Sequence, residues 1–290
     1  MKNGNKKEFP EQSAMKPKFV MLPLLLFTLA LLGVRQSSAL YQQSAAAYFN
    51  QADLGCDAFR RMQLGAHVME QLRGDAKQTG LSPGELLAIR LPFEHFSFGT
   101  GGRWTAGKYE AWRRLFFQKN REGYERVCQA YAALWNDVRC FPVSAPGVCY
   151  ENSWMFERTY GGLRGHEGTD LMPPENIAGY YPVVSMTDGV VEKIGWLPKG
   201  GWRIGIRSPS GGYFYYAHLD SYSRHYSVGD RISAGEVLGM MGDTGYGEEG
   251  TRGKFAVHLH LGIYIHTEEY EELSVNPYWV LRWAERKKER

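Results

Sequence analysis

Hydrophobic residues are distributed in three different ways along the chain. Residues 19–34 form one uncharged apolar run that has no polar face. Between about residue 42 and residue 139 the pattern is helical, in segments rich in Ala, Arg, Gln and Glu. From Phe141 onward the chain is rich in Gly, Val, Ile and Tyr, and its apolar runs become short. The pattern therefore predicts an apolar N-terminal helix, a helical region and a β domain.

Within the helical region we expect helices at 57–73, 82–90 and 108–138. Ser82 is suited to cap the second of them, because Pro83 follows it at the first helical position and Glu85 places an acid in the first turn. Six aromatic residues in the last helix predict a core stripe, with a surface for a partner helix as the alternative: Tyr109, Trp112, Phe116, Tyr124, Tyr131 and Trp135.

The β domain is predicted from short apolar runs that are bounded by turn residues. Many short strands with little helix favour an antiparallel arrangement, and with the helical region they predict an α+β chain. The expected strands are 182–186, 189–194, 202–208, 213–219, 237–241 and 255–265.

A domain boundary is expected near residue 141, where Pro142, Pro146 and Gly147 interrupt the helical pattern. The expected parts are a basic tail (1–18), a transmembrane anchor or signal segment (19–35), a helical region (42–140), the β domain (141–268) and a C-terminal helix (269–290).

The formal net charge of +3 arises in the N-terminal tail, where five lysines are only partly balanced by Glu8 and Glu11. The rest of the chain carries equal numbers of basic and acidic side chains. Without an excess of basic residues, the rest of the chain lacks the positive surface of a nucleic-acid-binding protein, so we expect no nucleic-acid partner.

Lysines ahead of the apolar run mark the cytoplasmic side of a membrane. The run is slightly short for a spanning helix of ~20 residues but long for the apolar part of a cleaved signal. We expect a single-pass anchor in the plasma membrane with the bulk of the chain outside. The alternative is secretion after cleavage near Ala39, which follows Ser37 and Ser38. Both outcomes export the remainder of the chain.

Four cysteines form no Cys-x-x-Cys pair, which argues against a zinc ribbon or a redox motif. Cys140 could pair with Cys149, and Cys56 with Cys128. Four buried thiols are the alternative.

The most informative stretch for chemistry is the apolar run 254–264, which contains His258 and His260. Side chains two residues apart lie on the same face of a strand, so one imidazole could hold a metal while the other reaches a group beside it. An isolated His-x-His is more typical of a half-buried strand, so the interpretation needs support from elsewhere.

That support comes from His166 and Asp170, which are four residues apart around Gly168. A catalytic zinc site uses three protein ligands, and this pair with one histidine of His258 and His260 would supply them. A loop ion pair is the alternative for His166 and Asp170 alone. His218 ends a predicted strand just before a turn, and its signal alone is the weakest.

Three segments in this order, 165–170 (GHEGTD), 216–220 (YAHLD) and 257–261 (VHLHL), resemble the lysostaphin-like, LytM-type zinc metallopeptidases that cut peptide bonds in bacterial peptidoglycan. The connecting segments 228–239 and 241–245 resemble the strands and turns of the same family. The resemblance covers about residues 150–268 and implies a mainly antiparallel domain of the duplicated hybrid motif type. It does not extend to the helical region.

The resemblance implies a zinc ion (Zn²⁺) bound by His166, Asp170 and His260, with His218 and His258 as catalytic residues that do not bind metal. Two neutral imidazoles and one carboxylate would leave the site with a net charge of +1, which favours hydroxide over water and can bring the pKa of bound water to ~7. Zinc-bound water would attack the carbonyl. Which of His218 and His258 is the general base stays open.

The function expected from the resemblance is a zinc-dependent endopeptidase acting on peptidoglycan stem peptides or cross-bridges, without a prediction of the bond that is cut. The alternative is a non-enzymatic wall-binding or partner-binding module of an envelope assembly. A purely structural zinc site fits less well, because such sites usually have four protein ligands. No protein partner of the helical region is predicted.

Overall fold

The computed structural model describes residues 18–99 and 103–288 of the chain. The basic tail expected at 1–18 therefore lies outside the described residues except for Lys18. By its internal contacts the chain divides into two compact units, one ending at Ala45 and the other spanning Ala46–Arg290. The expected domain bounds remain a prediction.

The first unit contains most of helix α1 (Lys18–Gln51), which includes the apolar run. Residues Met21–Gln51 are long and apolar enough to cross a membrane by length and composition, and a signal sequence near the N-terminus fits the same pattern. The large apolar side chains of its first half are exposed, among them Met21, Phe27 and Leu32.

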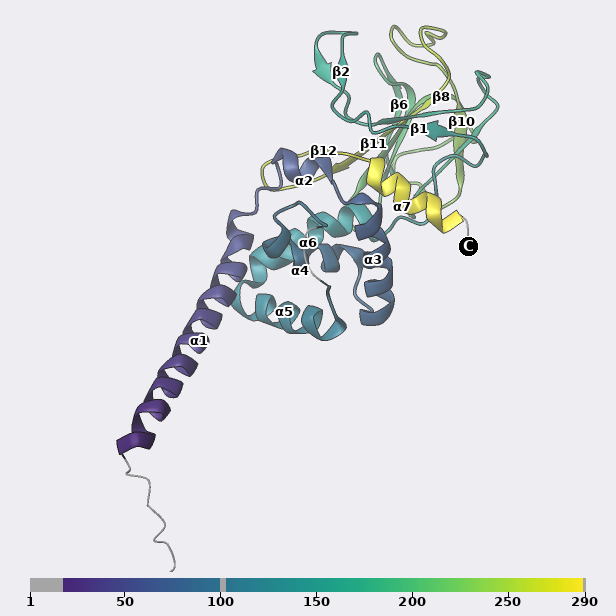
Figure 1. Ribbon diagram of the computed structural model, residues 1–290. Helices are drawn as coiled ribbons and strands as arrows, with labels where there is room; N and C mark the ends of the chain where they lie inside the picture. The colour runs from purple at the N-terminus through teal and green to yellow at the C-terminus, as the bar shows by residue number, and fades with distance from the viewer. Residues whose placement is uncertain (1–17, 100–102, 289–290) are drawn as a thin grey trace, which may run out of the picture. The chain divides into compact units, whose positions relative to one another are not determined.

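Five further helices form the helical part of the second unit (Figure 1). They are α2 (Asp57–Arg61), α3 (Gly65–Thr79), α4 (Pro83–Glu94), α5 (Ala106–Lys119) and α6 (Arg121–Trp135). Helix α4 begins as expected, because the Ser82 side chain accepts the N–H of Glu85 and the Glu85 side chain accepts the N–H of Ser82.

Two of the expected helices are each broken in two. The helix expected at 57–73 stops after Arg61, because Met62 adopts a left-handed conformation with φ 48° and its N–H donates to Phe59. The helix expected at 108–138 is interrupted at Asn120, whose φ of −155° is not helical. The Asn120 side chain then accepts the N–H of Gly123 and caps α6.

Aromatic side chains fill the helical core. The predicted stripe is buried except for Trp112, which is half-buried. Phe49, Phe116 and Tyr124 contact one another, and the Phe49 ring meets the other two edge to face with centroids 4.8 and 5.5 Å apart. The edge-to-face geometry favours one packing arrangement of these helices.

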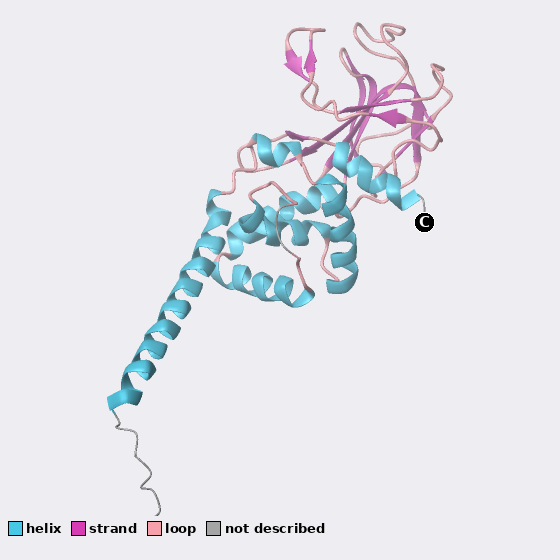
Figure 2. Cartoon of the chain, viewed as in Figure 1, coloured by secondary structure: helices cyan, strands magenta, loops and turns pink. Residues whose placement is uncertain are grey.

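The β part of the second unit is a ten-stranded sheet in which every described strand pair is antiparallel (Figure 2). Its main path runs β1-β4-β11-β8-β7-β6-β9, with β10 and β12 paired to β8 and β11. The predicted α+β class with a mainly antiparallel domain is confirmed. The strands are β1 (Cys149–Tyr150), β4 (Thr169–Met172), β5 (Pro182–Val184), β6 (Gly189–Leu197), β7 (Gly201–Arg207), β8 (Tyr213–Tyr222), β9 (Arg231–Ile232), β10 (Val237–Met241), β11 (Leu259–Ile265) and β12 (Leu273–Val275), with β2 (Glu157–Arg158) and β3 (Arg164–Gly165) in a separate hairpin.

The last predicted strand begins later than expected. Residues 255–257 precede β11 as loop, where Val257 N–H donates to the Asn176 side chain at 2.7 Å rather than to a strand. His258 forms an isolated bridge with Gly242. In the C-terminal segment β12 comes first, and helix α7 (Tyr278–Lys288) follows Asn276, whose side chain accepts the Tyr278 N–H at 3.0 Å.

Polar bonds join the helical and β parts of the second unit. The turn after β7 lies against the end of α6, where Gln129 donates to Ser210 O at 2.8 Å and Asp137 accepts the Ser210 N–H at 2.6 Å. The approach requires glycine at 212, because a Cβ there would lie 2.0 Å from Ala133 O. None of the four cysteines, all of which are described, is in a disulfide.

The Tyr216 hydroxyl is a polar anchor in the buried sheet. It accepts the Met186 N–H at 2.8 Å, and Tyr216 is fully buried. We expect Tyr216→Phe to lower the free energy of unfolding by ~1–3 kcal/mol, because it leaves a buried N–H without a partner. Chemical denaturation measures the change. The exposed Tyr180→Phe serves as the control, and equal stability of the two variants would contradict the account.

Candidate metal centre and cleft

The centre of the site is the pairing of two neighbouring strands. In β4 and β11, Asp170 and His260 are direct cross-strand partners. Residues opposite each other in an antiparallel pair project to the same face, so the register brings the two side chains together. His260 Nδ1 lies 3.0 Å from Asp170 Oδ1.

His166 reaches the same point from the loop between β3 and β4. Its backbone is fixed by two hydrogen bonds, from Met155 N–H to His166 O at 2.7 Å and from His166 N–H to Phe156 O at 2.8 Å. Its ring is buried, and Nδ1 lies 3.2 Å from Ser153 O. The same nitrogen lies 3.1 Å from Arg158 Nη2. In the tautomer that donates Nδ1–H to the Ser153 carbonyl, Nε2 has a free lone pair.

His166 Nε2 lies 3.0 Å from Asp170 Oδ1 and 3.0 Å from His260 Nδ1, so the three atoms form a nearly equilateral triangle. Zinc bonds of ~2.0–2.2 Å put neighbouring donors of a tetrahedral site roughly 3.3–3.5 Å apart. The three side chains therefore need to separate by only a few tenths of an ångström to fit the ion. They are also the one group of metal-ligating side chains found among residues 18–99 and 103–288.

The protonation states suit a cation. Burial raises the pKa of Asp170, but hydrogen bonding with His166 and His260 and the charges of His260 and His258 outweigh it and hold the pKa well below its usual range. Arg158 Nη2 also donates to Asp170 Oδ2 at 2.8 Å. Burial lowers the pKa of His260. An ionised carboxylate and a neutral imidazole are the forms that bind metal.

His218 projects toward the triangle because of a β-bulge. Ala217 and His218 of β8 lie opposite the single residue Arg203 of β7, and His218 has a left-handed φ of 61°. A non-glycine residue in this conformation is strained, and such strain is common at functional sites. His218 Nδ1 lies 2.8 Å from Thr244 O. Burial, followed by the neighbouring histidines, lowers the pKa of His218 well below its usual value.

His258 is the fifth member of the group. Its Nδ1 lies 2.7 Å from Ala256 O, and its Nε2 lies 3.7 Å from Asp170 Oδ1. The ring centroids of His258 and His218 are 4.7 Å apart. The structure thus brings together all five residues singled out from the sequence, with His258 and His218 beside the triangle.

These residues line a cleft of about 390 Å³ that the sequence patterns did not outline. Five basic side chains line it against three acidic ones. In the sequence, an arginine within a predicted strand has the pattern of a solvent-exposed residue. Only Arg164 could have been connected with the site from the sequence, because it lies next to the His166 motif. The basic residues are Arg158, Arg164, Lys193, Lys199 and Arg203, and the acidic residues are Glu167, Asp170 and Glu272.

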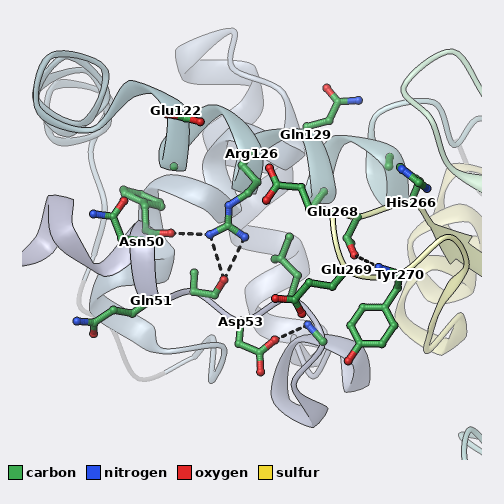
Figure 3. A pocket seen from close by; sticks show the side chains of 18 of the residues that line it. Asn50, Gln51, Asp53, Glu122, Arg126, Gln129, His266, Glu268, Glu269 and Tyr270 are labelled. Atoms are coloured by element: carbon green, nitrogen blue, oxygen red, sulfur yellow. Dashed lines mark hydrogen bonds between the residues drawn. The ribbon is translucent and has the colours of Figure 1, made fainter.

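A larger hollow of about 980 Å³ lies elsewhere in the second unit (Figure 3). At its centre Arg126 donates to the backbone carbonyls of Phe49 and Ala52 at 2.7–3.2 Å. The guanidinium therefore links the C-terminal end of α1 to α6 by hydrogen bonds. The five clustered residues lie outside this hollow, so its size does not indicate the reaction site.

An antiparallel sheet that carries a His-x-x-x-Asp pair beside a His-x-His pair is the arrangement expected of a lysostaphin-like peptidase domain. The family model described as Peptidase family M23 matches residues 164–277. The chain belongs to this family, and the resemblance inferred from the motifs is confirmed.

The relatives include endopeptidases. The chain is 43% identical over 164 residues to the L-Ala–D-Glu endopeptidase of Bacillus subtilis, a match that covers 56% of this chain and 49% of that protein. It is 31% identical over 134 residues to the glycyl-glycine endopeptidase ALE-1 of Staphylococcus capitis, covering 42% and 33%. The chain thus spans at most about half the length of these curated relatives.

A solved structure covers more of the chain. The crystal structure of a Ruminococcus gnavus protein assigned as a glycyl-glycine endopeptidase lytM has 45% sequence identity and a TM-score of 0.73. The match covers 84% of this chain and 96% of that chain. It therefore includes much of the helical region as well as the β part.

Gly168 is required by the position of His260. A Cβ at residue 168 would lie 2.5 Å from His260 Cε1 and 2.6 Å from Leu261 O. We expect Gly168→Ala to lower the affinity for a divalent metal ion by ~10–100-fold, because a displaced ligand breaks the triangle. Titration with zinc measures the affinity. Gly107→Ala, which meets nothing within 4 Å, is the matched control, and equal affinities of the two variants would contradict the assignment.

Proposed function

We propose that this protein is a zinc-dependent endopeptidase that hydrolyses peptide bonds in bacterial cell-wall peptidoglycan. The observation that carries the proposal is the triangle of His166 Nε2, Asp170 Oδ1 and His260 Nδ1, with sides of 3.0 Å, on the wall of a cleft. Membership of family M23 and the endopeptidase relatives support the class of substrate. A binding module would not need two further histidines beside the triangle.

In this proposal His166, Asp170 and His260 hold the metal. Zinc bound there would act as a Lewis acid that polarises the scissile carbonyl and lowers the pKa of water to ~7. Arg158, which donates to Asp170 Oδ2 at 2.8 Å, keeps the carboxylate oriented so that Oδ1 faces the two imidazoles.

His258 is assigned as the first proton acceptor. Its Nδ1 hydrogen is donated to Ala256 O at 2.7 Å, so in the neutral ring Nε2 carries the lone pair. That atom lies 3.7 Å from Asp170 Oδ1, beside the ligand atoms. Nε2 takes a proton from the attacking water while the water oxygen bonds to the carbonyl carbon. The carbon–nitrogen bond then breaks, and the leaving amine receives the proton that was taken from the water.

His218 is assigned to the developing negative charge on the carbonyl oxygen. Its Nδ1 hydrogen is donated to Thr244 O at 2.8 Å, so Nε2 is an acceptor in the neutral ring. His218 therefore donates from Nε2 only while it carries an additional proton. The proton that His258 takes from the water can supply it, because the two ring centroids are 4.7 Å apart. The same proton then passes from His218 to the leaving amine.

Helix α1 is proposed to anchor the protein in the plasma membrane with the catalytic unit outside, where its wall substrate lies. Secretion after signal cleavage near Ala39 is the alternative. Protease protection and the mass of the mature N-terminus distinguish the two. An N-terminus that begins after residue 39 would contradict the anchor.

Digestion of purified peptidoglycan by the full chain in detergent tests the activity. We expect new amine termini in the presence of zinc, loss of the activity after treatment with a chelator, and its return when zinc is added back. Mass spectrometry of the released peptides identifies the bond. A protein that holds stoichiometric zinc and yet releases no new amine termini would refute the proposed function.

The division of roles has its own test. We expect His260→Ala to lose zinc and activity, because it removes one of three ligands. His218→Ala should retain zinc and lose at least ~10²-fold in kcat, as expected when a group that acts on the reacting atoms is removed. Zinc content and kcat are measured on the same preparations, with exposed His225→Ala as the control. Metal loss in both variants would contradict the assignment.

A further inference from the structure

Arg203 is an arginine of the cleft wall with two guanidinium nitrogens that no described residue bonds. It lies in β7, and these two atoms, Nε and Nη1, are buried. A guanidinium presents five donors in a rigid fork, so buried donors without acceptors are unfavourable unless a ligand completes them.

Arg207 on the same strand provides a contrast. It is four residues from Arg203 and therefore on the same face. Its Nε and Nη2 donate to the two Glu192 oxygens at 2.5 and 2.7 Å, and Nη1 donates to Gly211 O at 2.9 Å. One arginine of this face is thus fully paired by the fold, whereas its neighbour is not.

Tyr213 separates the two arginines. A Cβ at Gly205, midway between them, would lie 2.0 Å from Tyr213 Oη, so the phenol occupies the space above this glycine. The Arg207 guanidinium lies 5.0 Å from the Tyr213 ring centroid. Arg203 is left on the other side of the ring, where it lines the cleft.

Arg164 contributes a second unsatisfied guanidinium from a different segment. Its Nε is buried and has no hydrogen-bond partner in the described part of the chain, and its Nη1 donates a long hydrogen bond of 3.5 Å to Gly165 O. Both Arg164 and Arg203 lie within electrostatic reach of the Tyr215 hydroxyl, where they oppose the effect of burial that raises its pKa to about 12. The Tyr215 ring is 6.0 Å from the His260 ring between centroids. The two arginines therefore lie around Tyr215 in the cleft that the three residues of the triangle also line.

Two of the three acidic residues of the cleft are engaged elsewhere. Asp170 bonds Arg158 and the histidines, and Glu272 bonds Lys193. Among residues 18–99 and 103–288, no carboxylate forms a hydrogen bond with Arg203 Nε or Nη1. A carboxylate from the substrate would supply two acceptor oxygens in the geometry that a guanidinium fork prefers.

We propose that Arg203, assisted by Arg164, binds a carboxylate of the substrate one or two residues from the scissile bond. This inference rests on the proposed function of the same cleft. It predicts that the protein prefers acidic peptides, such as a stem peptide with a free glutamate carboxylate, over neutral peptides such as glycine bridges.

Binding to the chelator-treated full chain in detergent tests the subsite without requiring activity. The probes are a synthetic stem peptide with a D-glutamate residue, the same peptide with the glutamate carboxylate amidated, and a third amidated only at its C-terminus. We expect one amidation to weaken binding by at least ~10-fold, as for loss of a charge-assisted hydrogen bond, and the affected peptide identifies which carboxylate binds. Equal affinities for all three would overturn the proposal.

Variants connect the preference to Arg203. We expect Arg203→Gln to abolish the difference between the free and amidated peptides, and Arg203→Lys to retain part of it. Arg207→Gln, on the same strand face, should keep the full difference, with circular dichroism to verify its fold. A loss of affinity in Arg203→Gln that is equal for free and amidated peptides would overturn the proposal.

Cleavage of the same peptides by the zinc-loaded protein separates this inference from the proposed function. A carboxylate preference in binding without cleavage of any peptide would leave the subsite in place and count against the endopeptidase. Cleavage of free and amidated peptides with equal kcat/KM and equal affinity would overturn the subsite while the endopeptidase stands.

Discussion

The site depends on the register between β4 and β11, which sets Asp170 directly opposite His260. A slip of one residue would turn one of the two side chains to the other face of the sheet and remove a ligand from the triangle. The hydrophobic residues around them fix this register, because Leu171, Leu259 and Leu261 alternate with the ligands and are fully buried. Burial of the sheet and placement of the proposed metal ligands are thus specified by the same alternation.

The loops and the β-bulge around Asp170 and His260 place further side chains beside this pair. The β3–β4 loop brings His166 to the third corner, and Gly168 within it leaves room for the His260 ring. The bulge in β8 turns His218 toward the cleft with an unusual φ of 61°. Backbone carbonyls lie within hydrogen-bond distance of Nδ1 of three imidazoles, at Ser153 for His166, at Thr244 for His218 and at Ala256 for His258. In a neutral ring that donates Nδ1–H to its carbonyl, Nε2 is left available for metal or proton.

The sequence predicted the α+β class and the residues that gather at the site. The spacing of residues along one strand and the order of three motifs can be recognised without knowledge of the tertiary structure. It did not predict the break at Met62, since a left-handed methionine has no glycine signal, or the start of β11 at Leu259, since the apolar pattern continues on both sides. The arginines of the cleft were also missed. Whether Arg203 or Arg207 finds a carboxylate depends on Glu192 and on Tyr213, which come from other strands.

The central claim is that one zinc ion is held by two histidines and one aspartate while two further histidines remain outside its coordination. X-ray diffraction from crystals of the zinc-loaded full chain, recorded on both sides of the zinc absorption edge, tests it most directly. The account predicts one anomalous peak bonded to His166 Nε2, Asp170 Oδ1 and His260 Nδ1, with His218 and His258 beside it and not bonded to it. A peak coordinated by His218 or His258, or located away from the β4–β11 pair, would contradict it.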